Sequence, residues 1–142
     1  MVAMTSARSV GASFALTPTF FGPLDPARLL ETRAGAATFD GISAGIGYRT
    51  QGSTTQLQVT GRAGVPNDAS SVVLNITVTN AAGPGFVTIY PCGSPKPDAS
   101  SLNYSTGSTI ANGVIAKVGT GGKVCLYTSN ATDLIADING YF

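Results

Sequence analysis

The sequence predicts an all-β protein: a β-sandwich of jelly-roll or immunoglobulin-like type, with about nine or ten short strands. Three observations support this prediction. Runs of alternating apolar and polar residues recur along the chain, turn-forming residues separate them roughly every 8–12 positions, and no stretch has the periodicity of an amphipathic helix. The 142 residues suffice for one ordinary domain. We expect a sandwich domain over residues 22–142, preceded by an extended arm or first strand over residues 1–21.

The segment 70–92 contains the clearest strand pattern. Alternate positions carry aliphatic side chains, as in a half-buried strand. After it, residues 80–85 supply glycines and a proline that favour a turn, and residues 86–90 are again β-prone. The segment therefore predicts a β-hairpin. The alternating aliphatic residues are Val72, Leu74, Ile76 and Val78.

The N-terminal third is less regular. Residues 1–21 match a signal peptide poorly, and within them residues 9–21 are β-prone and low in charge. Two alternatives stay open for this arm: it adds as a strand to the sheet edge of a neighbouring copy, or it folds back as the first strand of its own domain. Residues 26–33 are expected to form a structured connection with at most one helical turn.

Further strands follow from the same alternation. The segment 119–122 has the composition of a hairpin turn, and residues 132–142 are apolar enough on both faces to form a central strand. The other expected strands are residues 42–48, 55–60, 102–104, 109–118 and 123–127.

The two cysteines, Cys92 and Cys125, lie in or beside strand-like runs without CxxC spacing. An even pair of this kind predicts a disulfide formed in an oxidising compartment, hence an extracellular or cell-surface location. A loop of this length would stabilise the fold by roughly 3–4 kcal/mol. The alternative is two buried free thiols in a cytosolic protein.

Composition argues against several functions. The net charge is +1, only 11% of the residues are charged, and the basic residues are scattered, so neither nucleic-acid binding nor membrane insertion is expected. Histidine is absent, which removes the commonest general base and most zinc sites. The serine motif SxxK is absent too. We therefore expect no enzyme and no cofactor.

The few charged residues cluster near the start of the domain. Asp25, Arg28, Glu31 and Arg33 fall close together and favour an ion-pair clamp over a catalytic group, since no nucleophile accompanies them. Asp137 lies within the apolar segment at the C-terminus, where an unpaired carboxylate would be costly. We expect it to be buried and paired with Arg28 or Arg33.

Three oxygen-bearing residues near the C-terminus, Asp133, Asp137 and Asn139, suggest calcium ligands. They lie on one face of one strand, however, and the spaced loop of an EF-hand is missing. No metal site is predicted.

Two residue sets could form a ligand surface. Asn75, Thr77 and Thr79 make a polar ladder on one strand face, which could meet ice, sugar or a neighbouring subunit, or simply be solvated. The tyrosines could stack on sugar rings or fill the core of the sandwich. Those proposed for a ligand surface are Tyr90, Tyr104 and Tyr127.

Seven motifs together suggest a family. They are PARLLETR (26–33), GVP (64–66), SSVVLNITVTN (70–80), GFVTIYPCG (85–93), SSLNY (100–104), GGKVCLY (121–127) and DLIADINGYF (133–142). The chain resembles a secreted or cell-surface β-domain that is widespread in actinobacteria and related bacteria. The resemblance implies export and a non-catalytic accessory, adhesive or structural role, with no catalytic residues to carry over. We expect an extracellular structural or self-assembling module whose partner is itself; the alternative is an accessory module for a surface polysaccharide.

Overall fold

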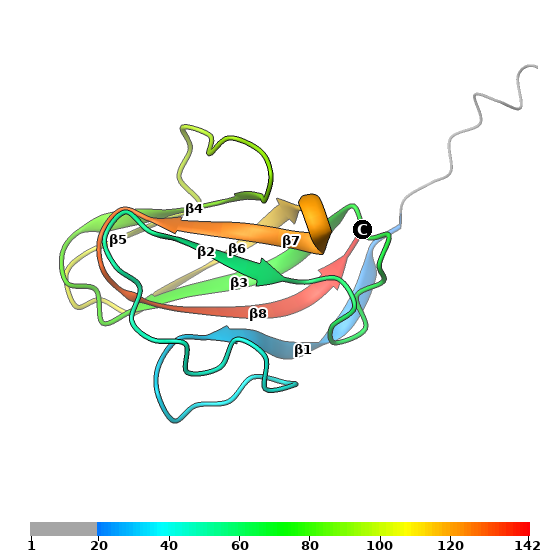
Figure 1. The fold of residues 1–142 in the computed structure, drawn as a ribbon, viewed down its shortest axis with the longest axis horizontal. Coiled ribbons are helices and arrows are strands. Elements are labelled where there is room, and N and C mark those ends of the chain that lie inside the picture. The colour runs from blue at the N-terminus through cyan, green and yellow to red at the C-terminus, as the bar shows by residue number, and fades with distance from the viewer. Residues whose placement is uncertain (1–19) are drawn as a thin grey trace, which may run out of the picture.

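The computed structural model describes residues 20–142, which form eight strands in two antiparallel sheets (Figure 1). Residues 1–19, which make up most of the predicted arm, lie outside the described part of the chain. The strands are β1 (Gly22–Glu31), β2 (Thr54–Gln58), β3 (Ser71–Thr79), β4 (Gly85–Pro91), β5 (Leu102–Tyr104), β6 (Ile110–Lys117), β7 (Lys123–Thr128) and β8 (Asp133–Tyr141), with a short 3-10 turn η1 (Thr120–Gly122) before β7.

The strand order assigns the sandwich to the jelly-roll type. One sheet has the order β1-β8-β3-β6 and the other β2-β7-β4-β5. The first strand thus pairs with the last, the second with the seventh, the third with the sixth and the fourth with the fifth. This nested pairing is that of a long hairpin folded over on itself, the double Greek key of a jelly roll.

The core lies between the two sheets. Strand β3 contributes four side chains that are fully buried, as the alternation of its sequence predicts. The opposite sheet supplies Leu57, Val87, Val124 and Leu126, also fully buried. Strand β8 lies between β1 and β3, which confirms that the C-terminal segment is a central strand. The four β3 residues are Val72, Leu74, Ile76 and Val78.

The predicted hairpins are wrong although their strands are right. Strands β3 and β4 lie in different sheets, so the turn after Thr79 carries the chain across the sandwich. The same holds for β6 and β7, which η1 connects. A turn that joins two sheets needs glycines just as a hairpin turn does. The alternation of apolar and polar residues identifies strands, but it does not say which strands pair.

Two N-terminal expectations are also corrected. Residues 26–31 belong to β1, an edge strand in which irregular pairing around Pro23 and Pro26 accommodates the prolines. The expected strand at residues 42–48 is a loop instead. It turns through Gly41, Ser43 and further residues with positive φ, and hydrogen bonds such as Glu31 N–H to Ser43 O hold it against β1.

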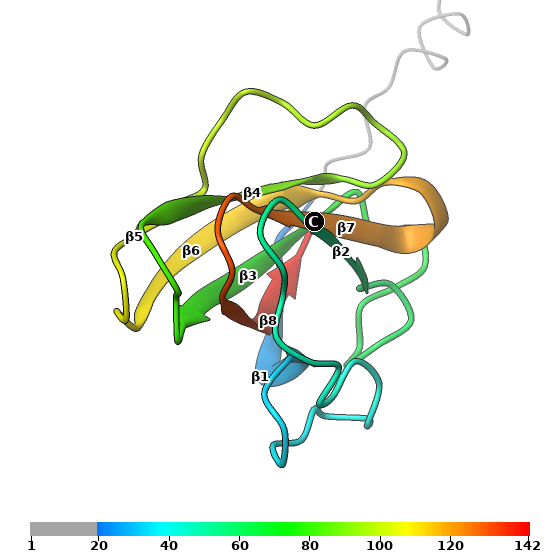
Figure 2. The ribbon, with the colours of Figure 1, turned by 60° about the vertical axis from the view of Figure 1, so that its left-hand side comes forward.

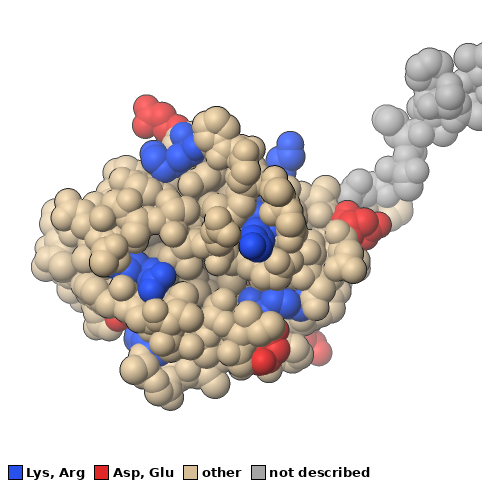
Figure 3. Space-filling view, viewed as in Figure 1, with Lys and Arg blue, Asp and Glu red and all other residues tan. Residues whose placement is uncertain are grey.

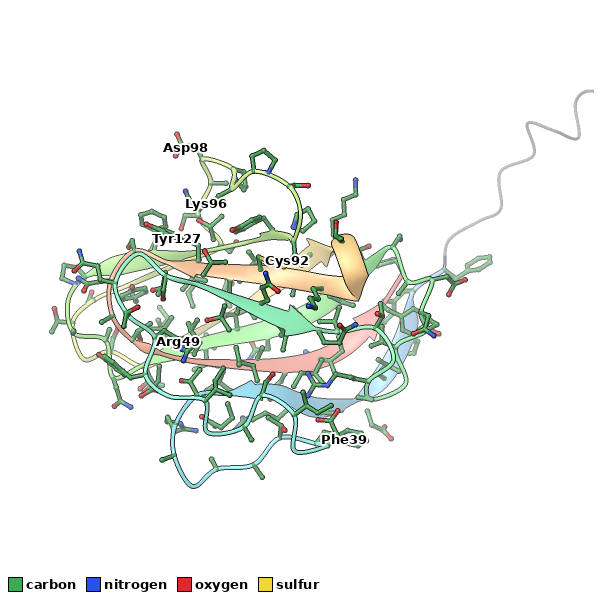
Figure 4. All side chains as sticks on the ribbon, in the orientation of Figure 1. Phe39, Arg49, Cys92, Lys96, Asp98 and Tyr127 are labelled. Carbon is green, nitrogen blue, oxygen red and sulfur yellow. A yellow bond between two sulfur atoms is a disulfide. The ribbon has the colours of Figure 1, made fainter. Side chains whose placement is uncertain are left out.

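The disulfide Cys92–Cys125 is present, and it holds the loop of residues 92–101 beside β7 (Figure 2). Figure 4 shows how this loop approaches the sheet: the Lys96 Nζ atom lies 4.7 Å from the ring centroid of Tyr127. The Thr88 hydroxyl donates a hydrogen bond to the Ala99 carbonyl, which adds a second tether. The loop therefore covers part of the outer face of the β2-β7-β4-β5 sheet.

Candidate ligand-binding cleft

The outer face of the β1-β8-β3-β6 sheet carries a cleft of about 560 Å³. Its centre is one register row that crosses all four strands, because Arg28 is opposite Asp137, Asp137 opposite Asn75, and Asn75 opposite Gly113. Every one of these four residues lines the cleft. Residues far apart in the sequence thus meet in a single line of side chains.

Pairing irregularities shape the cleft. The register of β8 against β3 shifts between Val73 and Leu74, so that Asn139 is an extra residue on β8. The register of β1 shifts between Pro23 and Ala27, next to the cleft wall. Bulges re-aim side chains and often lie beside functional sites. Here one of them adds Asn139 to the cleft lining.

The floor is open at Gly113 in β6. A β-carbon added at this position would meet no atom within 4 Å. The glycine therefore leaves space where another residue would extend above the sheet. Val73 and Asn75 of β3 form the neighbouring part of the lining.

An ion-pair network fixes the charged side chains. Arg28 donates from Nε to Asp137 Oδ1 (2.9 Å) and from Nη2 to Asp137 Oδ2 (3.3 Å). Its Nη1 donates to Glu31 Oε2 (3.2 Å), and Arg33 donates to the same carboxylate from Nε (2.9 Å) and Nη2 (2.7 Å). Arg28 therefore contacts Asp137, whereas Arg33 contacts Glu31. The Asp137 side chain is 24% exposed, less buried than expected, since it faces the cleft.

Electrostatics keep these groups charged. Hydrogen bonds from Arg33 hold the pKa of the buried Glu31 carboxyl below its usual value, against the opposing effect of burial. The hydrogen bond to Asp137 raises the pKa of Arg28. The two arginines and two carboxylates of the network balance, so the cleft has hydrogen-bonding groups without a net charge.

Two amide side chains in the cleft are available to a ligand. Within residues 20–142, no hydrogen bond to protein involves the side chain of Asn75 or Asn139, although both are half-buried. Each amide can donate and accept. The Asp137 carboxylate accepts one bond at each oxygen from Arg28 and keeps further lone pairs. The cleft thus offers both hydrogen-bond donors and acceptors.

One wall of the cleft is held by a buried arginine. Ala37 lines the cleft from the loop between β1 and β2, where the Phe39 N–H donates to the Arg28 carbonyl. Arg62, only 5% exposed, ties this loop to the sandwich. Its guanidinium donates to the carbonyls of Leu29, Gln58 and Ile42 and to both carboxylate oxygens of Asp40.

The Arg62–Asp40 pair is strongly coupled. Asp40 accepts from Arg62 Nε at 2.8 Å and from Nη2 at 2.7 Å. These hydrogen bonds lower the pKa of Asp40 to about 2, against the opposing effect of burial. The Asp40 carboxylate therefore stays ionised at physiological pH.

The predicted polar ladder is divided by the structure. Asn75 lies in the cleft, and Thr77 is half-buried one row further along β3. Thr79 is only 7% exposed, and its Oγ1 lies 2.7 Å from Thr109 Oγ1. Thr79 is thus an internal contact and offers little to a ligand.

The predicted tyrosine surface is largely unavailable. Tyr104 is buried in the core, where its hydroxyl lies 2.8 Å from Thr128 Oγ1. Tyr127 lies beneath Lys96, and Tyr90 is half-buried on the neighbouring strand of the same sheet. Because the cleft is on the other sheet, the tyrosines and Asn75 do not share one surface.

Two of the three candidate calcium ligands, Asp133 and Asp137, are engaged with protein groups, whereas within residues 20–142 the Asn139 amide is not. Asp133 accepts from the Thr32 hydroxyl at 2.6 Å and from the Asn80 amide at 3.0 Å. Asp137 is bound by Arg28. Nowhere in the described part of the chain do three His, Cys, Asp or Glu residues form a group that could hold a metal ion.

Sequence reasoning missed the cleft itself, along with Ala37, Arg62 and Gly113. For Arg62 a signal existed: in a chain with few charges, Asp40 and Arg62 remained without an assigned partner. For Gly113 and Ala37 none existed, because their roles depend on which strands and loops lie side by side.

No known family model matches the chain, and a search of curated proteins finds no match. The actinobacterial family thus stays a resemblance. Among residues 20–142, no helix is long and apolar enough to cross a membrane.

Proposed function

We propose that this protein is a non-catalytic binding module whose cleft takes a neutral, polyhydroxylated ligand, namely a carbohydrate. The observation that carries the proposal is the pair of unpartnered amides, Asn75 and Asn139, which lie in one cleft with the Arg28–Asp137 pair.

The chemistry of this lining suits sugar hydroxyls. A hydroxyl group donates one hydrogen bond and accepts others. The Asp137 carboxylate supplies acceptors, the Arg28 guanidinium supplies donors, and the amides supply both. A phosphate or carboxylate ligand would instead favour an excess of positive charge, which this balanced network lacks.

The cleft predicts weak binding of a single sugar. No aromatic ring is among its lining residues, so the stacking that strengthens many sugar sites is missing. It is also open to solvent along the sheet. We expect dissociation constants on the order of 1 mM, about 4 kcal/mol, for a short oligosaccharide.

An extracellular or cell-surface location is part of the proposal. The disulfide Cys92–Cys125 supports it, because such bonds persist in oxidising environments. The resemblance to a secreted actinobacterial domain points the same way. A polysaccharide of a cell wall or surface would be a ligand encountered there.

A glycan microarray tests the proposal. The full-length protein is applied at high density together with the variants Asn75→Ala and Asn139→Ala. The matched control is Asn103→Ala, which removes an exposed amide from the other sheet. We expect a restricted set of glycans to bind wild type and the control, and both cleft variants to lose the signal. Absence of any bound glycan, or equal binding by all four proteins, would contradict the proposal.

A second function, self-assembly through strand addition, is also proposed. The arm suggested for this purpose lies almost wholly outside the described residues. What supports assembly within residues 20–142 is the free edge of β6, an eight-residue strand with a single charged residue, Lys117.

A further inference from the structure

The four sheet edges of the sandwich differ in their protection. β1 carries two prolines and two register shifts, and the loop of residues 32–53 pairs with its end at Glu31. β2 and β5 are edge strands of only five and three residues. Prolines, bulges and shortness are devices that prevent edge-to-edge pairing. β6, with eight residues and neither proline nor register shift, has only Lys117 for this purpose.

The backbone of β6 offers alternate residues to a new strand. The Val118 N–H donates to Ser70 O at 2.9 Å, so this residue directs its backbone groups toward β3. Since backbone direction alternates along an antiparallel strand, Ala111, Gly113, Ile115 and Lys117 direct theirs toward the free edge. No hydrogen bond outside the β3–β6 ladder involves these groups in the described chain.

The side chains of the same residues lie on the outer face of the sheet. Ile115 is 67% exposed, a high value for a large aliphatic residue. Two positions away on this face, Gly113 leaves open space where a side chain would be. One strand thus carries both a projecting group and a gap. Figure 3 shows the side of β2 and β7, behind which β6 lies, and charged side chains are few and scattered on that side.

We propose that β6 is a homodimerisation edge that pairs antiparallel with β6 of a second copy. With the two Val114 residues facing each other across the two-fold axis, Ile115 of each copy is opposite Gly113 of the other. Those residues are among the ones with free backbone groups, so the same register forms the hydrogen bonds and places the isoleucine over the gap.

Charge and symmetry are compatible with this register. Lys117 of each copy is opposite Ala111 of the other, so the two lysines lie at opposite ends of the interface and do not repel each other directly. The interface is isologous and closes at two copies. The two β1-β8-β3-β6 sheets become one continuous sheet, which presents both clefts on the same side, each with Ile115 of the other copy at its Gly113 end. The inference stands on the edge strand alone and does not require that the cleft bind a carbohydrate.

The test is the molar mass of the full-length chain across a concentration series, by light scattering and sedimentation velocity. Wild type should approach twice the 14.3 kDa chain mass as concentration rises. Ile115→Lys should remain at the single-chain mass. Its matched control is Ile42→Lys, the same replacement at a position that is 52% exposed on the loop between β1 and β2, which should dimerise like wild type.

A second variant, Gly113→Val, separates loss of the interface from loss of the fold. In Gly113→Val the added β-carbon meets no atom within 4 Å in the single chain, so we expect the fold to be retained, while the valine side chain fills the space that Ile115 needs. It should weaken dimerisation at least tenfold while its melting temperature at low concentration stays near that of wild type. A single-chain mass at every wild-type concentration overturns the proposal. So does a dimer that survives both β6 variants, or one that only Ile42→Lys abolishes.

Discussion

Replacing the buried Arg62 by methionine should destabilise the fold and release the cleft wall. Methionine keeps much of the volume of the stem but removes every donor of the guanidinium. The carbonyls of Leu29, Gln58 and Ile42 then lose their hydrogen bonds to Arg62, and Asp40 loses its ion-pair partner.

The magnitude follows from those contacts. Each lost hydrogen bond to a charged group costs about 1.5–3 kcal/mol when its acceptor stays dry, and less when water replaces the donor. The Asp40 side chain is 23% exposed and can be hydrated, so its share is small. We expect a loss of about 3 kcal/mol. At roughly 0.3 kcal/mol per kelvin for a chain of this length, the melting temperature should fall by about 10 °C.

Thermal unfolding at several pH values is the assay. The pKa of Asp40 is about 2 in the folded protein, below its ordinary value of 3.8. The pair therefore stabilises the wild type above about pH 4, and this contribution is lost as pH falls toward 2. Arg62→Met should lack this part of the acid dependence. A melting temperature within about 2 °C of wild type at neutral pH would refute the anchoring role of Arg62.

Three further outcomes are expected. Replacing Cys92 and Cys125 by alanine should cost about 4 kcal/mol, given the sequence separation of 33, and a melting temperature insensitive to the replacement would contradict this. Asp137→Asn leaves Arg28 with one fewer charged partner in a half-exposed setting, so the melting temperature should fall by only a few degrees, about 1 kcal/mol, while glycan binding is lost; unchanged values of both would count against the ion pair. Because the pKa of Glu31 is lowered in the folded state, its stabilising contribution should be present at neutral pH and disappear in acid, which a Glu31→Gln variant with a flatter acid profile would show.

The fold was largely predictable because alternation is a local property. The buried face of β3 follows from the spacing of its aliphatic residues, and the central position of β8 follows from its apolar composition. Which strands pair is a property of the whole chain. The glycines after Thr79 fit a hairpin and a crossing between sheets equally well, and the nested order of a jelly roll leaves no local trace.

Of the site, only the ion pair of Asp137 was predictable, because a charged residue within an apolar strand needs a partner of opposite charge. This need predicted Arg28 or Arg33 for Asp137, and the structure shows Arg28 in this role. Asn139 was considered as a calcium ligand, yet its place in the cleft depends on the bulge that adds a residue to β8. The tyrosines show the converse error: residue type suggested sugar stacking, whereas Tyr104 fills the core and Lys96 covers Tyr127.

The measurement that most directly tests the binding proposal is an NMR titration of the full-length, ¹⁵N-labelled protein with the best glycan from the array. The proposal predicts that shift changes centre on Arg28, Asn75, Asp137 and Asn139, with the side-chain amide signals of the two asparagines among the largest. Changes centred on Tyr90 and the loop of residues 92–101, with the cleft unaffected, would contradict it and place the binding surface on the opposite sheet.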